Sequence, residues 1–224
     1  MATRIKFQQR LDELKERLLV MAGMAEQAIT RSIEAYQTRD LSICEQVFRA
    51  EPAINRLERE IDQMALDLLA MEQPMAIDLR FILSIIRINA DLERVGDQAV
   101  NIAVRVREMG AFDTYDLPVD IPKLASLASA MVRQALQAFI EADADMAEAV
   151  LTMDDQVDEM NDGAFTSLTA LIRERPDLTP QSLSALIISR NLERVGDHAT
   201  NIAEDVIFWV RGADVRHSMS RGKM

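Results

Sequence analysis

The sequence has few of the residues that interrupt helices or favour sheets. Its 224 residues include only 7 glycines and 6 prolines, and 4% of the chain is aromatic. The abundant residues are alanine, leucine, glutamate, arginine, methionine and glutamine, which lose little free energy on entering a helix. Because 49% of the residues are hydrophobic, enough to bury a core, the composition predicts an all-α globular protein.

Further absences exclude whole classes of protein. The single cysteine, Cys44, cannot form an intrachain disulfide. No stretch approaches the roughly 20 apolar residues of a membrane span, and the start of the chain lacks the apolar segment of a signal peptide. We therefore expect a cytoplasmic protein without membrane insertion. The formal net charge of −12 would repel nucleic-acid phosphates, so direct nucleic-acid binding is not expected.

Apolar residues at three- and four-residue spacing predict six long helices. In the first half, one helix includes residues 11–29, a second starts behind Asp40 and is kinked or broken at Pro52, and a third runs from after Pro74 to near Gly110.

After a linker at 110–122, the same plan returns in the second half. Asp120 opens a fourth helix, a fifth covers residues 144–175, and Thr179 caps a sixth that ends at Gly212.

An internal repeat fixes the expected architecture. Residues 89–103 and 189–203 match at ten of fifteen positions, including the unbroken run LERVGD. Such self-similarity indicates a duplicated structural unit. The sequence therefore predicts an all-α fold of two tandem, homologous three-helix bundles, divided into residues 1–112 and 113–224.

Each copy of the repeat places oxygen-bearing side chains on one strip of its helix. They are Glu93, Asp97 and Asn101 in the first copy, and Glu193, Asp197, Asn201 and Glu204 in the second. Because ionised carboxylates are costly to bury, we expect both strips to face away from the bundle cores. Carboxylates one helical turn apart repel each other, and a bound cation would reverse that repulsion.

The helix before each strip carries further oxygens. They are Glu51 and Asn55 in the first half, with a second ladder of Glu58 and Asp62, and Asp154 and Asp158 in the second half. Antiparallel packing would bring these oxygens to the strips, where they suit Mg²⁺, Mn²⁺, Ca²⁺, iron or zinc. A merely solvated acidic face is the alternative. The two asparagines could also bond across helices instead of binding metal.

Other residues favour a structural interpretation. Gly96 and Gly196 lie in helix interiors, which suggests close approach of a neighbouring helix. His198 is turned away from Glu193 and is expected to be structural. The sequence has no Glu-x-x-His pair and no recognisable nucleophile with its base, so we expect no catalytic residues and no enzyme activity.

The stretches QPMAIDLRFILSIIRINADLERVGDQAVNIA (73–103) and ISRNLERVGDHATNIAEDVIFWVRGADVRH (188–217) resemble the PhoU family of bacterial phosphate-transport regulators. The resemblance implies two homologous three-helix bundles. It also implies that the ExxxD motifs Glu93–Asp97 and Glu193–Asp197 hold metal clusters, with Asp154 and Asp158 contributing from the preceding helix. Iron, zinc, manganese and magnesium ions are all compatible with this expectation.

The same resemblance implies a function and partners. The protein is expected to restrain the phosphate-starvation response when phosphate is plentiful, by linking the ATPase subunit of the phosphate ABC transporter to a sensor histidine kinase. A homodimer is the expected assembly. The competing hypotheses are a carboxylate-bridged metalloenzyme and a metal-free helical scaffold.

The two repeats are not identical in their oxygens. Asn55 gives the first half one carboxylate fewer on the preceding helix, and Val104 stands where the second half has Glu204. We therefore expect the second site to bind metal more tightly than the first.

Overall fold

Six α-helices make up the described part of the chain, as the sequence predicts. The computed structural model describes residues 2–72, 74–113 and 115–215, and it contains no strand there. The helices are α1 (Ala2–Thr38), α2 (Leu41–Glu72), α3 (Ala76–Met109), α4 (Ile121–Glu141), α5 (Ala144–Glu174) and α6 (Thr179–Arg211), with a 3₁₀ turn at Pro176–Leu178. None of these helices has the length and apolar character needed to cross a membrane.

The helix ends follow local chemistry, with two departures from the prediction. Asp120 caps α4 by accepting a hydrogen bond from the Lys123 backbone N–H at 3.0 Å, and Gly212 ends α6 with a φ of 69°. Of the kink or break predicted at Pro52, the break does not occur, because α2 continues through it. The predicted capping role of Thr179 is also wrong. Its hydroxyl donates to the Pro176 carbonyl at 2.7 Å, and the residue already belongs to α6.

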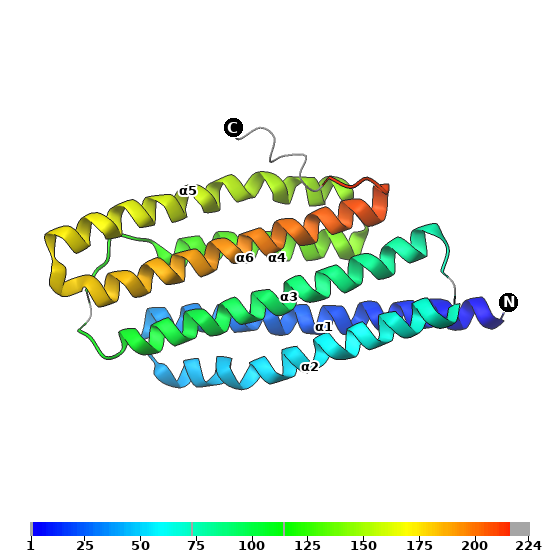
Figure 1. Cartoon of the computed structure of the whole chain (residues 1–224), viewed down its shortest axis with the longest axis horizontal. Helices are drawn as coiled ribbons and strands as arrows, with labels where there is room; N and C mark the ends of the chain where they lie inside the picture. The colour runs from blue at the N-terminus through cyan, green and yellow to red at the C-terminus, as the bar shows by residue number, and fades with distance from the viewer. Residues whose placement is uncertain (1, 73, 114, 216–224) are drawn as a thin grey trace.

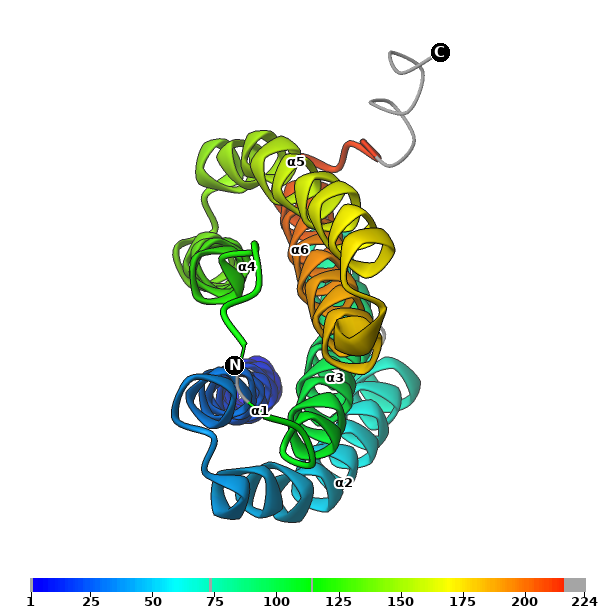
Figure 2. The same cartoon turned by 90° about the vertical axis from the view of Figure 1, so that its left-hand side faces the viewer.

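The helices form a curved layer with two helices covering its inner side. In order, α2, α3, α6 and α5 build the layer, while α1 and α4 lie against it (Figure 1 and Figure 2). The most extensive contact between any two described helices joins α3 to α6. The two helices that carry the repeated LERVGD run therefore also make the largest contact between the halves.

One continuous apolar core runs through both halves. It includes Leu14 of α1, Ile88 of α3, Phe139 of α4 and Ile188 of α6, all fully buried. Burial of this kind is the main favourable term in folding. Because the core crosses from α3 to α6, the halves are packed on each other as closely as the helices within each half, and the strips on α3 and α6 are held in fixed relation.

Candidate functional site

Side chains of the preceding helix pack directly against the glycine of each LERVGD run. A Cβ atom at Gly96 would lie 3.1 Å from Ile54 Cδ1 of α2, and one at Gly196 would lie 3.3 Å from Val157 Cγ1 and 3.5 Å from Asp154 Oδ1 of α5. Only glycine leaves this space open without displacing a neighbour. The expected reason for a mid-helix glycine is thereby confirmed.

Glu193 departs from the prediction that the acidic strips face away from the core. The residue is buried, with 8% of its surface exposed. Its Oε1 accepts a hydrogen bond from Arg190 Nη1 at 2.6 Å. Its Oε2 is buried and has no hydrogen-bond partner among the described residues. The prediction was wrong here because an arginine one turn away offsets the cost of burying the carboxylate.

The negative charge of Asp158 on α5 acts on two carboxylates of the second strip, Glu193 and Asp197. Burial raises the pKa of Glu193, and the negative charges of Asp197 and Asp158 raise it further, against Arg190. The pKa of Asp197 is also raised, first by desolvation and then by Asp158. With Asp154 beside Gly196, four of the five predicted acids of the second half, all but Glu204, lie along the crossing of α5 and α6.

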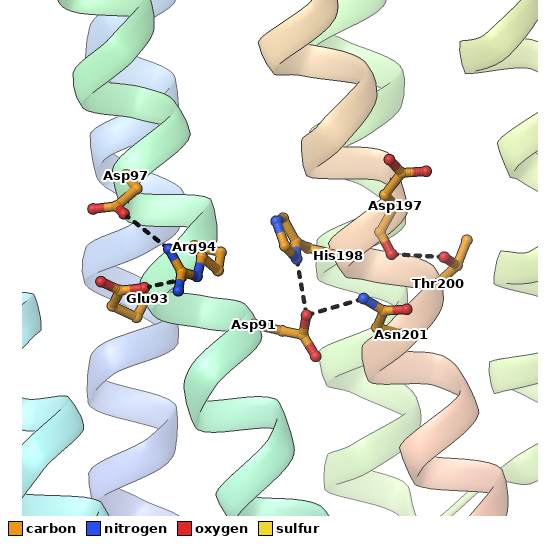
Figure 3. A network of polar contacts seen from close by, with 8 residues as sticks. All are labelled: Asp91, Glu93, Arg94, Asp97, Asp197, His198, Thr200 and Asn201. Carbon is orange, nitrogen blue, oxygen red and sulfur yellow. Dashed lines mark hydrogen bonds and ion pairs between the residues drawn. The ribbon is translucent and has the colours of Figure 1, made fainter. Parts of the chain in front are cut away.

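The first strip has a related arrangement, but the residue that α2 contributes to it differs from the one expected. The pKa of Glu93 is raised by burial and then by Asp97, with smaller contributions from Glu58 and Glu51. Arg94 lies between the two strip acids, with Nε 3.5 Å from Glu93 and Nη1 3.8 Å from Asp97 (Figure 3). From the sequence, Asn55 was the expected counterpart of Asp158, so one carboxylate fewer was predicted on α2. Glu58 supplies that carboxylate instead.

The two crossings differ in the side chains beside the glycines. Ile54 and Asp154 stand 100 residues apart, as the two LERVGD runs do. Each lies beside the glycine of its crossing, although Val157 is slightly nearer to Gly196 than Asp154 is. Ile54 is buried apolar core, whereas Asp154 offers a carboxylate there. Ile54 is therefore one source of the asymmetry between the sites, and it lies one residue before Asn55, where the difference was expected.

In their present positions the acidic side chains do not form a preorganised metal site. Across the residues that the structure describes, no three His, Cys, Asp or Glu side chains are arranged to hold one ion together. Binding would require side-chain rotation at either crossing. The buried Oε2 of Glu193, which lacks a hydrogen-bond partner, is the atom that a cation would satisfy.

The two predicted asparagines do not join these clusters. Asn201 Nδ2 donates to Asp91 Oδ1 across the α3–α6 interface at 3.1 Å, and Asn101 is exposed on α3. His198 Nδ1 lies 2.8 Å from the same Asp91 oxygen. Figure 3 shows this network between α3 and α6, with Glu93 and Asp97 on the far side of α3 from it. The structural role predicted for His198 is confirmed.

Three residues of these sites were missed or underrated in the sequence. Asp91 and Arg190 lie outside the repeated run, and nothing in their spacing marks them as partners of His198 and Glu193. Glu58 was visible as part of a second acidic ladder. Its 100-residue spacing from Asp158 is the signal that would have assigned it to the first site.

These features define an all-helical protein of two repeats, each with acidic side chains at a glycine-marked helix crossing. The family model described as "PhoU domain" matches residues 18–106 and 121–206. The chain belongs to the PhoU family.

Similar proteins agree with this assignment. The phosphate-specific transport system accessory protein PhoU homolog of Pseudomonas putida is 38% identical over 215 residues, covering 95% of this chain and 83% of that protein. PhoU of Escherichia coli K12 is 31% identical over 212 residues, covering 95% and 88%.

Solved structures match the fold equally well. The crystal structure of PhoU from Pseudomonas aeruginosa superposes with a TM-score of 0.89 at 36% identity, covering 92% of this chain and all of that one. A phosphate transport system regulatory protein PhoU from Streptococcus pneumoniae gives a TM-score of 0.83 at 26% identity, covering 93% and 99%. These relatives carry names of accessory or regulatory proteins and not of enzymes.

Proposed function

We propose that this protein is an accessory regulator of a phosphate-specific transport system, which restrains the phosphate-starvation response when phosphate is plentiful. The observation that carries the proposal is the match of both repeats to the PhoU domain, together with relatives named as accessory proteins of that system. In this proposal the protein acts in the cytoplasm as a homodimer. It links the transporter ATPase subunit to a sensor histidine kinase.

The acidic crossings are proposed to bind divalent or ferric ions. Support comes from the raised pKa values of Glu93, Glu193 and Asp197, each caused partly by a neighbouring negative charge, and from the buried Oε2 of Glu193. A bound ion would supply positive charge where carboxylates now repel each other. Carboxylate oxygens suit manganese, magnesium, iron and zinc, so the donor set fits the group.

Deletion of the gene tests the regulatory part. A reporter of the phosphate-starvation response should become active in rich phosphate and return to silence when the wild-type gene is restored. A reporter that stays silent in the deletion strain would remove the support for regulation. Purified protein should also retain the ATPase subunit and the kinase in separate pull-downs.

A variant with both strips neutralised tests whether the acids are needed. It combines Glu93→Gln, Asp97→Asn, Glu193→Gln and Asp197→Asn, which keep side-chain shape while removing charge. If metal binding is required, the variant folds but fails to silence the reporter. Metal analysis of protein purified without chelator separates the alternatives, since a metal-free scaffold would silence the reporter while holding no metal.

A further inference from the structure

Arg190 distinguishes the second site from the first. It lies on α6 one turn before Glu193 and pairs with Glu193 Oε1 at 2.6 Å, with its own side chain 58% exposed against 10% for the glutamate. The position 100 residues earlier is Ala90. In the first site the nearest cation is Arg94, whose contacts with Glu93 and Asp97 are longer, at 3.5 and 3.8 Å.

The two carboxylate oxygens of Glu193 have different surroundings. Oε1 accepts from the guanidinium, while Oε2 is buried without a hydrogen-bond partner among the described residues. A divalent ion at Oε2 would add positive charge beside the guanidinium, and like charges this close repel. Two ligands that oppose each other at one group lower each other's affinity by the same factor.

We propose that Arg190 is a built-in counter-ion that competes with divalent ions for Glu193 and so sets the cation affinity of the second site. This inference rests on the proposed metal binding. Arg190 keeps the buried carboxylate neutralised while no ion is present. Because its side chain is largely exposed, it can turn into solvent when an ion arrives, at the cost of one ion pair.

Titration with Mn²⁺ alone, followed by calorimetry, tests the proposal. Arg190→Ala, which copies Ala90 of the first repeat, should bind Mn²⁺ more tightly than wild type at one site, on the order of tenfold. The matched control Arg94→Ala should change the affinity less. In a Glu193→Gln background, Arg190→Ala should have no effect on Mn²⁺ binding, because the group for which the two cations compete is gone.

Thermal unfolding gives a second readout that a purely structural role would not produce. In chelator, Arg190→Ala should melt below wild type, because Glu193 loses its partner. Saturating Mn²⁺ should remove or reverse that difference. A deficit of the same size with and without Mn²⁺ would overturn the proposal.

The binding outcomes also separate this inference from the metal proposal beneath it. If wild type binds Mn²⁺ and Arg190→Ala binds no more tightly, competition by Arg190 is refuted while metal binding stands. If neither protein binds Mn²⁺, both are refuted. Binding by Arg190→Ala but not by wild type supports competition in its strongest form.

Discussion

At the scale of single residues, Glu193 combines burial with negative neighbours. Asp158 and Asp197 both oppose its charge, and Arg190 partly compensates them. Asp154 brings a further carboxylate to the same crossing, where the first repeat has the apolar Ile54. This difference gives the second site one carboxylate more than the first beside the helix crossing.

The single-residue prediction concerns the unequal sites. Asp197→Ala should weaken the tighter Mn²⁺ affinity by about tenfold or more, because even the loss of a residue that only supports a metal ligand costs that much. Asp97→Ala, the matched change in the first repeat, should affect only the weaker phase of a calorimetric titration. A larger loss from Asp97→Ala would show that the ranking of the two sites is wrong.

At the scale of helices, the close packing of α5 on α6 depends on Gly196 of α6. Gly163, the glycine of α5, has no such role. A Cβ at Gly163 of α5 would meet nothing within 4 Å, whereas one at Gly196 would meet Val157 at 3.3 Å. Alanine is the better helix former at both positions. The two positions therefore separate helix propensity from packing.

Gly163→Ala should raise the free energy of unfolding by about 0.5–1 kcal/mol, because alanine restricts the unfolded chain without a clash. Gly196→Ala should give no such gain, since the added methyl group lies too close to Val157 and pushes it away from α6. Urea denaturation measures both. Equal stabilisation by the two changes would mean that α5 can move away from α6 at the crossing without a loss of stability.

The α3–α6 contact offers a second test at the scale of helices. Asp91→Ala and His198→Ala each remove one partner of the 2.8 Å contact and should lower the free energy of unfolding by about 1 kcal/mol. Because the two groups interact directly, the double variant should lose less than the sum of the single losses. Strict additivity in chemical denaturation would rule out their coupling.

At the scale of the whole molecule, the chain carries a net charge of −12 around a core shared by both repeats. The raised pKa values of Glu93, Glu193 and Asp197 mean that the folded protein holds these protons to higher pH than the unfolded chain does. Stability from these groups therefore falls as pH rises from the ordinary carboxylate range through the folded pKa values.

Because these carboxyl groups destabilise the folded protein as they ionise, a variant without them should depend on pH differently from wild type. Protein carrying Glu93→Gln, Glu193→Gln and Asp197→Asn should gain stability relative to wild type between about pH 4 and pH 7, where carboxylates ionise. Thermal unfolding across this range in chelator measures the difference. Added Mn²⁺ should stabilise wild type and leave the variant unchanged. A stability difference that does not vary with pH would contradict the electrostatic account.

The sequence by itself determined the helices, the duplication and the acidic strips. Periodic apolar residues specify the helices locally, and the repeated run places Glu93 with Asp97 and Glu193 with Asp197 one turn apart whatever surrounds them. The mid-helix glycines likewise predicted the close approach of a neighbouring helix, because glycine destabilises a helix interior unless its small size is needed for packing. These features depend on residues within a few turns of one another.

Only the tertiary structure decided which side chains from other helices complete each site. It assigned Glu58 in place of Asn55, joined Asp91 to His198 and placed Glu193 in the interior. The rotation of α2 against α3, and of α3 against α6, depends on how the whole core packs. Contacts between distant segments therefore follow from shape complementarity across the interface, which spacing along one helix does not encode.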